Sequence, residues 1–349
     1  MMHSAKKQII LCGMGTVGKA FARLLDERRG QVAKKYGLDI EIAAAVDVGG
    51  AAVADHGALP LDELLVHVDA GGTVETFSPH GRPGVSGVEA ISSIPAEVMV
   101  ETTPTNLVDG EPARGHIFAA LNNGLDVVSA NKGPLVLFHR EILELAKDKG
   151  CRIFMSAATA AALPTLDVGV ICLAGANVLA VEGILNGTTN YILTRMHLEK
   201  CSYETGLKAA QEMGIAETDP TLDVEGLDTR NKIVVIANRI FDRHFGLDDV
   251  AVEGITRVTP ADIDKAVEAG KVIKLVGSAE LNDGDVTISV GPTVLETEHP
   301  LAAVNYAEKS ISYLTDTMGR VTVTGGKSSP TGAAAALLKD LIHTVMLAA

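Results

Sequence analysis

Residues 13–18, Gly-Met-Gly-Thr-Val-Gly, form a G-x-G-x-x-G turn, and this turn constrains the fold more than any other part of the chain. The apolar run QIILC at 8–12 precedes it and predicts a strand, and residues 19–37 follow it with helical spacing. This order is typical of a βαβ unit that binds a dinucleotide at the helix N-terminus. The alternative is a glycine turn that serves packing alone. The residues expected to hold the phosphates are Gly13, Gly15, Thr16, Val17 and Gly18.

The first 150 residues alternate between strand and helix patterns. Further strands are predicted from EIAAAVD (41–47), EVMVET (97–102), LDVVSA (125–130) and CRIFMSA (151–157). Further helices are predicted at 61–65, 110–124 and 140–150. Strands separated by helices of this length imply a parallel sheet. We therefore predict an α/β protein whose residues 1–150 form a Rossmann-like, doubly wound dinucleotide-binding domain.

The pattern changes from about residue 160 onward. Residues 203–214 and 229–241 predict longer helices, whereas 286–296 and 319–325 alternate with period two. These segments predict a second α+β domain, residues 151–328, whose sheet has one covered face and which serves catalysis and dimerisation. The apolar helix within 329–349 is expected to return to the first domain.

Composition limits the partners and the compartment. The net charge is −14, which disfavours nucleic acid in the absence of a basic patch, and the sequence contains none. No apolar run reaches the ~18 residues of a membrane span, and the N-terminus passes directly into a strand. The four cysteines include no CxxC pair, which favours the reducing cytoplasm, and Cys12, Cys151 and Cys172 are expected in the core.

Asp47 ends the second predicted strand, where an acid would accept hydrogen bonds from the adenosine ribose hydroxyls. It comes later than the usual ~20 residues after the glycine turn, which fits the long first helix. Residues 48–51 contain no Arg or Lys for a 2′-phosphate. NAD is therefore favoured, with NADP as the alternative; a plain turn residue is the other interpretation of Asp47.

The stretch AETDPTLDVEGLDTRNK, residues 216–232, crowds five carboxylates ahead of Lys232. Carboxylates are the natural partners of a substrate ammonium group. Asp228 and Lys232 have i, i+4 spacing, so both face one side of a helix that starts near Asp228. A general base must be a neutral amine, which a second amine nearby favours, and Lys132 and Lys232 are candidates for such a pair. Helix capping by Asp228 is the structural alternative.

Four strings together resemble the homoserine dehydrogenases: ETTPTN (101–106), SANKGPL (129–135), EGILNGTTNYIL (182–193) and the acidic stretch 216–232. The resemblance covers essentially the whole chain and points to the short form without a C-terminal regulatory domain. It implies an NAD(P)-dependent enzyme of amino-acid biosynthesis, on the route to threonine and methionine. Its reaction would interconvert L-homoserine and L-aspartate 4-semialdehyde. It also implies a homodimer formed through the second domain.

The resemblance also implies roles for single residues. Lys232 would be the general acid/base on the substrate hydroxyl, and Lys132 would serve both catalysis and the nicotinamide side. The substrate would be bound by Glu217, Asp228, Asp223 and Thr188. The nicotinamide ribose would lie against Thr102 and Thr103.

One segment departs from the family pattern. Where the family has a turn of the type E-A-T-V-G-G-G-I-P, residues 156–164 read SAATAAALP. Alanine tolerates positive φ poorly, and its methyl group narrows a turn. The family turn also holds a monovalent cation, which could bind here only weakly, through the backbone of Thr159, Ala161 and Leu163. Two alternatives therefore stay open: a paralogous dehydrogenase of another small hydroxy or oxo compound, and a non-catalytic dinucleotide sensor.

Overall fold

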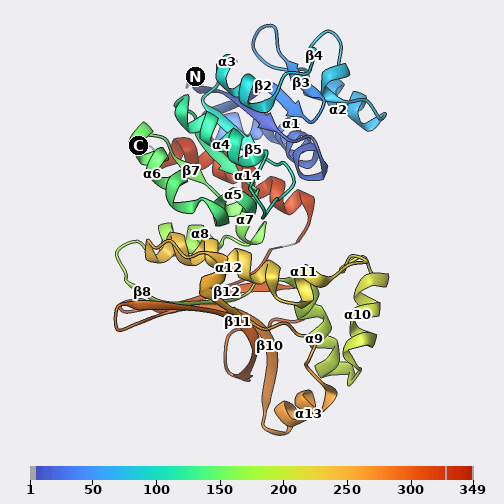
Figure 1. Cartoon of the computed structure of the whole chain (residues 1–349), viewed down its shortest axis with the longest axis vertical. Helices are drawn as coiled ribbons and strands as arrows, with labels where there is room; N and C mark the ends of the chain where they lie inside the picture. The colour runs from blue at the N-terminus through green and yellow to red at the C-terminus, as the bar shows by residue number, and fades with distance from the viewer. Residues whose placement is uncertain (1–4, 327, 348–349) are drawn as a thin grey trace. The chain divides into compact units, whose positions relative to one another are not determined.

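The computed structural model describes residues 5–326 and 328–347. The chain divides into two compact units (Figure 1). The first comprises the described residues up to Ala161 together with those from Ser329 onward, and the second comprises those of Ala162–Ser328. The second unit is thus inserted between the last helix of the first unit and the rest of it.

The first unit is built on a seven-stranded sheet with the order β4-β3-β2-β1-β5-β6-β7. Its strands are β1 (Ala5–Cys12), β2 (Leu38–Asp47), β3 (Gly50–Val53), β4 (Gly81–Pro83), β5 (Val98–Glu101), β6 (Asp126–Ser129) and β7 (Ile153–Phe154). The α/β prediction is confirmed, and β2, β1, β5, β6 and β7 run parallel as expected. The sheet is nevertheless mixed, because β3 and β4 add an antiparallel edge. Strands β3 and β4 are short and contain glycine, so they carry no alternating pattern.

Helices cover both faces of this sheet. They are α1 (Thr16–Tyr36), α2 (Leu61–Asp69), α3 (Gly87–Ser93), α4 (Ala113–Asn122), α5 (Lys132–Leu137), α6 (His139–Lys149), α7 (Ser156–Ala160) and α14 (Pro330–Met346), with the short 3-10 turn η1 (Val74–Thr76). Successive residues of β1 point to opposite faces: Ile9 and Leu11 join one apolar cluster with α1 and α14, and Ile10 joins another with α3, α4 and α6. The buried half of the strand, residues 9–12, is therefore entirely apolar, as expected where helices cover both faces of a parallel strand.

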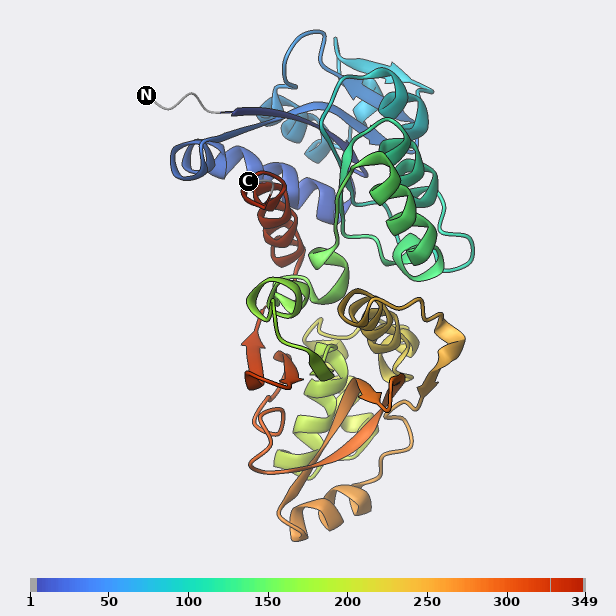
Figure 2. The ribbon, with the colours of Figure 1, turned by 90° about the vertical axis from the view of Figure 1, so that its left-hand side faces the viewer.

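The last helix, α14, packs against the first unit. Leu337 and Leu341 belong to the same apolar cluster as Phe21 and Leu25 of α1. Figure 2 shows the red C-terminal helix beside the blue helix α1. Its N-terminus is capped by the Ser329 hydroxyl, which accepts a hydrogen bond from the Gly332 amide at 3.0 Å.

The second unit contains a six-stranded sheet with the order β13-β12-β8-β10-β11-β9. Its strands are β8 (Val178–Ile184), β9 (Val250–Val252), β10 (Lys271–Asn282), β11 (Asp285–Glu296), β12 (Lys309–Thr315) and β13 (Gly319–Gly325). Its helices are α8 (Thr165–Asp167), the π turn η2 (Val168–Cys172), α9 (Gly187–Glu199), α10 (Tyr203–Glu212), α11 (Thr221–Val224), α12 (Leu227–Phe241), the 3-10 turn η3 (Leu247–Asp249) and α13 (Pro260–Glu268).

Helix α12 packs closely against the second sheet. Gly277 of β10 lies so close to α12 that an added Cβ would meet Thr229 Cγ2 at 2.9 Å, so the helix packs tightly on this face. Hydroxyl groups pair across neighbouring strands at other sheet positions, as in the 2.8 Å contact between Ser312 and Thr322. The prediction of an α+β unit with a helix-covered sheet is confirmed.

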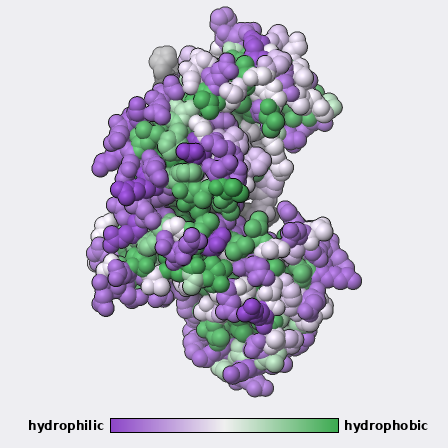
Figure 3. All heavy atoms as spheres, viewed as in Figure 1, coloured by the Kyte–Doolittle hydropathy of each residue, from purple (hydrophilic) through white to green (hydrophobic). Residues whose placement is uncertain are grey.

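The surface agrees with the composition. Hydrophilic residues are spread over much of the face seen in Figure 3, with apolar patches between them. Among the helices of the described residues, none is both long enough and apolar enough to cross a membrane.

Two local predictions are wrong. Residues 151–157 form a strand only at Ile153–Phe154, and the small residues that follow form helix α7 instead. Cys12 is buried as expected, but Cys151 is half-buried and Cys172 is exposed at the end of η2. In both cases a short apolar stretch has helical or turn geometry that periodicity over so few residues does not reveal.

The alanine-rich segment ends on a strained residue. Ala161 has φ 53° and ψ −115°, where a side chain is unfavourable, whereas Ala160 lies inside α7. We expect Ala161→Gly to raise the unfolding free energy by about 1 kcal/mol, because relief of strain outweighs the added freedom of the unfolded chain. The matched variant Ala160→Gly should lower it by about 1 kcal/mol. Urea unfolding measures both, and equal destabilisation by the two variants would contradict the strain at Ala161.

Candidate active site

Two glycines of the turn at 13–18 are required by the fold itself. Gly13 has φ 95°, and a Cβ there would lie 2.8 Å from the backbone of Thr102 and Thr103. A Cβ on Gly18 would lie 1.9 Å from the Gly13 carbonyl oxygen. Neither position admits a side chain, since the clashing atoms are backbone atoms that cannot move aside.

Gly15 is different, because nothing in the protein requires a glycine there. Its φ is −73°, and a Cβ would meet no atom of the described residues within 4 Å. It is the N-cap of α1, it makes no side-chain cap, and the first turn of the helix contains no acid. Free amide donors at a helix N-terminus beside an open, exposed backbone are what a pyrophosphate requires. The residues present therefore fit a dinucleotide.

The turn lies at the switch point of the sheet. β1 has β2 on one side and β5 on the other, so the chain reverses its direction of winding between β1 and β5. The loops after these strands meet: the Thr102 amide donates to the Cys12 carbonyl at 2.8 Å, and its hydroxyl donates to the Gly13 carbonyl at 2.7 Å. Ligands of open α/β sheets bind at such a point.

Asp47 lies beside the glycine turn. Its Oδ2 accepts a hydrogen bond from the Met14 amide at 3.1 Å, and its Oδ1 accepts one from the Val48 amide at 2.9 Å. The carboxylate is thus held at the carboxyl end of β2 and is only partly buried. A carboxylate oxygen can accept more than one hydrogen bond, so this geometry leaves capacity for ribose hydroxyls.

A buried network holds the loop after β5 and the start of α5. Glu101 is fully buried; its Oε1 accepts hydrogen bonds from the amide and the hydroxyl of Thr103, and its Oε2 lies 2.8 Å from His116 Nδ1. Asn131 Nδ2 donates to the Thr103 carbonyl at 2.9 Å, and Asn131 Oδ1 accepts from the Gly133 amide at 3.0 Å. Asn131 thereby caps the helix that Lys132 begins. The network connects Thr103 to Lys132 through backbone positions.

Sequence reasoning missed Glu101, His116 and Asn131, although two of them lie within the strings ETTPTN and SANKGPL.

Cys12, Glu101 and His116 also lie close enough to hold a metal ion. Burial raises the pKa of the Cys12 thiol well above its ordinary value, so the thiolate that a metal requires is disfavoured. Both Glu101 oxygens already have partners, and we interpret the cluster as structural.

In the second unit, three predicted residues form one polar cluster. Lys232 Nζ donates to Asp228 Oδ2 at 2.5 Å and to the Leu185 carbonyl at 2.8 Å. Asn186 Nδ2 donates to Asp223 Oδ1 at 2.7 Å and to Asp228 Oδ2 at 3.0 Å. The side chains of Lys232 and Asp228 are only 13% and 17% exposed, so their ion pair is stronger than a surface pair.

Local sequence explains how this cluster forms. Gly226, with φ 79°, turns the chain into α12, and Asp228 lies in the first helical turn rather than at the cap. The i, i+4 spacing then brings Asp228 and Lys232 together, as predicted. Asn186 is the N-cap of α9, where its Oδ1 accepts a hydrogen bond from the Thr189 amide at 3.0 Å. This amide side chain was missed from the sequence, although it lies in the string LNGTTNYIL.

The other predicted residues of this unit are placed separately. The Thr188 hydroxyl donates to the Ile215 carbonyl at 3.1 Å, which ties α9 to the loop before the acidic stretch. Glu217 is exposed on that loop. The Leu163 carbonyl accepts a hydrogen bond from the Thr165 amide at 2.8 Å, whereas Thr159 belongs to the first unit, where it is buried in α7.

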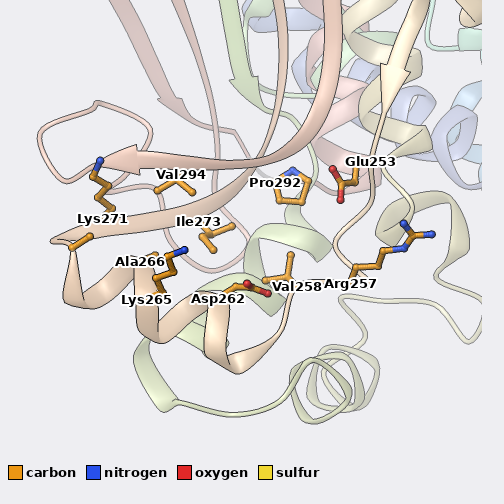
Figure 4. A pocket seen from close by; sticks show the side chains of 11 residues that line it. Glu253, Arg257, Val258, Asp262, Lys265, Ala266, Lys271, Ile273, Pro292 and Val294 are labelled. Carbon is orange, nitrogen blue, oxygen red and sulfur yellow. The ribbon is translucent and has the colours of Figure 1, made fainter.

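A groove of about 510 Å³ lies between α13 and the strands β10 and β11 (Figure 4). Figure 4 shows Ile273 and Val294 on the strand side and the charged Asp262 and Lys265 on the helix side. None of its eleven lining residues is a predicted site residue. We therefore do not assign the chemistry to this groove.

The turn at 13–18, which is the candidate phosphate cradle, contains no titratable side chain, whereas the second unit holds the Lys232 amine among carboxylates. Division of labour between a dinucleotide-binding unit and a unit that handles protons is typical of the nicotinamide-dependent dehydrogenases. Comparison with known proteins agrees. Residues 13–156 match the family model of the homoserine dehydrogenase NAD-binding domain, and residues 164–342 match that of homoserine dehydrogenase.

Individual relatives extend this match over the chain. A homoserine dehydrogenase of Methanocaldococcus jannaschii is 39% identical over 96% of this chain and 97% of its own length. An NAD(+)-dependent homoserine dehydrogenase of Pseudomonas canavaninivorans is 35% identical over 96% of this chain and 95% of its own. The crystal structure of a homoserine dehydrogenase from Thiobacillus denitrificans superposes with a TM-score of 0.82 at 28% identity, over 100% of this chain and 75% of that one.

The chain therefore belongs to the homoserine dehydrogenase family, and its activity is that of a homoserine dehydrogenase with an NAD-binding domain. This confirms the family and the activity expected from the sequence. The cofactor preference and the roles of single residues are separate questions.

Gly15 allows a direct test of the phosphate cradle. Gly15→Ala should leave the unfolding free energy unchanged, because its backbone is unstrained and its Cβ meets no atom of the described residues within 4 Å. It should weaken dinucleotide binding about tenfold or more, since a methyl group would occupy the space of the pyrophosphate. Isothermal titration with NAD and urea unfolding measure the two effects. Gly30→Ala, elsewhere in α1, is the control and should bind NAD normally; unchanged NAD affinity in Gly15→Ala would contradict the cradle.

Proposed function

We propose that Lys232 is the general acid/base in the interconversion of L-homoserine and L-aspartate 4-semialdehyde. The contact that carries this proposal is the ion pair with Asp228, since it fixes the amine at a defined position with little exposure to water. In oxidation the substrate hydroxyl proton passes to the neutral Lys232 amine, and in reduction the ammonium returns it. The nicotinamide, when bound, supplies the hydride chemistry.

Asp228, Asp223 and Glu217 are proposed to bind the ammonium group of the substrate. Asn186 supports this role for two of them, because its amide holds Asp223 and Asp228 in one cluster. Carboxylates so placed match an amino-bearing substrate better than a plain hydroxy acid. Thr188 is proposed to line the same region, by way of its contact with the Ile215 carbonyl.

The cofactor is proposed to be NAD, with NADP as the weaker alternative. Asp47 would accept the ribose hydroxyls, Gly13, Gly15, Thr16, Val17 and Gly18 would hold the phosphates, and Thr102, Thr103 and Lys132 would serve the nicotinamide side. The observation in favour of NAD is the carboxylate itself, since its charge would repel a 2′-phosphate. Lys132 is proposed to assist catalysis as well, and the cap from Asn131 supports a fixed position for it.

Three further proposals come from the resemblance or from the composition. We propose a homodimer formed through the second unit, which a monomeric mass in light scattering would contradict. A cytoplasmic location is proposed from the cysteine pattern, and a secreted, disulfide-bonded form would oppose it. A weak monovalent cation at the carbonyls of Thr159, Ala161 and Leu163 stays a prediction, and activity independent of K⁺ and Na⁺ would oppose it.

Removal of the Lys232 amine tests the mechanism. Lys232→Ala should lower kcat for homoserine oxidation by about 10²–10⁴-fold, the usual contribution of a general acid/base, and leave NAD affinity unchanged. Absorbance of the reduced cofactor measures turnover. Lys208→Ala, on the exposed face of α10, is the control. Retained turnover in Lys232→Ala would contradict the proposed role of Lys232 as the general acid/base.

The charge of Asp47 tests the cofactor preference. The wild-type kcat/KM should be higher with NAD than with NADP, and Asp47→Asn should shift the ratio toward NADP by about tenfold, since the repulsion of a 2′-phosphate is lost. General damage to the glycine turn would instead lower both values together. Asp62→Asn, on α2, should leave the ratio unchanged. A wild-type preference for NADP would show that Asp47 does not select the cofactor.

A further inference from the structure

Lys309 is a buried lysine beside the catalytic pair. It is the first residue of β12, its side chain belongs to the largest fully buried ones, and the residue is only 1% exposed. β12 lies between β13 and β8, and Leu185, the carbonyl partner of Lys232, directly follows β8. A lysine in such a position must either find partners or lose its charge.

The surroundings decide between these outcomes. Burial lowers the pKa of Lys309 to about 7, the charge of Lys232 lowers it further, and Asp228 opposes the shift. Lys309 therefore interacts electrostatically with both members of the catalytic pair on α12. Asp223 of α11 joins the same cluster through Asn186.

Other charges near these strands are already paired. On the adjacent strands, Glu182 of β8 accepts a hydrogen bond from Arg320 of β13, and it also lies 3.1 Å from His299. Glu308, the neighbour of Lys309 on the chain, is exposed. Of the described charges, those of Asp228 and Lys232 are therefore the ones that act on the pKa of Lys309.

We propose that Lys309 is a positioning residue for proton transfer: its buried amine shares protons with Lys232 and Asp228 and keeps the cluster able to accept the substrate proton. The inference rests on the proposed role of Lys232. In oxidation the O–H bond of the substrate breaks and its proton goes to Lys232 Nζ, after a proton of the Lys232 ammonium has passed to the neutral Lys309 amine. When Lys309 is itself protonated, it cannot take a proton from Lys232, and Lys232 then cannot act as a base.

A second buried lysine shows that burial alone does not give this role. Lys274 is 2% exposed, and burial lowers its pKa to about 8. Its Nζ donates to the Val304 carbonyl at 2.5 Å and to Asn190 Oδ1 at 3.1 Å, and both oxygens are neutral. Lys274 ties β10 to α9 and to the segment around Val304, so it is a matched control for a lysine with a structural role.

The test is the pH dependence of kcat/KM for L-homoserine oxidation, which reports groups of the free enzyme. Wild type should lose activity as the pH falls through about 7, where Lys309 becomes protonated. In Lys309→Met the midpoint of this loss should move up by about one pH unit or more, and kcat/KM at neutral pH should fall about tenfold, since no neutral amine then stands beside Lys232 to take its proton. Lys274→Met should leave the midpoint in place, even if the protein is less stable. A Lys309→Met profile that is lowered without a shift of its midpoint would overturn the proposal.

A second measurement does not depend on activity. Below pH 7 the Lys309 amine is protonated in both states; between pH 7 and the ordinary lysine pKa of ~10.4, the unfolded chain holds a proton that the folded protein does not. The unfolding free energy of wild type should therefore rise relative to Lys309→Met between pH 7 and about 9. If this relative rise is absent, Lys309 does not titrate there and the inference fails.

The outcomes separate the two proposals. Wild type without homoserine turnover at any pH would contradict the proposed function, whereas an unshifted midpoint with full turnover contradicts only the role of Lys309. If Lys309→Met does not fold, wild type labelled with ¹³C at lysine Cε takes its place. A lysine resonance that titrates near pH 7, and moves to another midpoint in Asp228→Asn, supports the proposal; its absence overturns it.

Discussion

The hydrogen-bonded ion pair of Lys232 and Asp228 is the interaction on which the proposed chemistry of the second unit depends. A half-buried ammonium is stable only where acceptors surround it, and here one acceptor is a carboxylate one helical turn away and the other is the Leu185 carbonyl. That carbonyl lies just beyond β8, so the sheet fixes its position, and Asn186 then begins α9. Strand β8, the cap of α9 and the ion pair are therefore coupled. Displacement of β8 would remove the Leu185 carbonyl from Lys232 and the Asn186 cap from α9.

The first unit relies on a different constraint, the close approach of backbone to backbone at the switch point. Gly13 and Gly18 leave no space for a Cβ, and Gly15 leaves more space than the protein uses. Gly13 and Gly18 allow the sheet and α1 to pack closely together. Gly15 leaves open space at the N-terminus of α1, where the dinucleotide is proposed to bind. A glycine that serves the fold is identified by a clash or a positive φ; a glycine that serves a ligand is identified by the absence of both.

Local patterns predicted much of this protein, and tertiary partners account for what they missed. The i, i+4 spacing of Asp228 and Lys232 and the G-x-G-x-x-G turn are properties of consecutive residues, so the sequence was sufficient for them. Strand β3 pairs with β2 across a two-residue turn, but its short run of small residues carries no alternating pattern; β4 is held by hydrogen bonds to β3, which is distant in sequence, and both strands were missed. Asn186, Asn131 and Glu101 were missed for the same reason: an amide or carboxylate acquires its role from the groups that meet it, and a single sequence does not state which groups those are. The segment 156–164 shows the converse, because positive φ at Ala161 falls within the stretch where glycines were expected from the resemblance.

The two buried lysines of the second unit show why partners matter more than burial. Desolvation favours the neutral amine at both Lys274 and Lys309, and it is the largest cause of the lowered pKa in each. Lys274 donates hydrogen bonds to amide, hydroxyl and carbonyl oxygens, which keep their own charge when it titrates, and burial holds the pKa of the nearby His197 at about 4, so this imidazole stays neutral over the same pH range. Lys309 interacts with an ammonium and a carboxylate, so each proton that it gains or loses changes the energy of the pair beside it. Lys274 and Lys309 are thus equally buried but differ in role. Lys274 stabilises the structure, whereas Lys309 is proposed to influence acid/base chemistry, and the charges of their neighbours account for the difference.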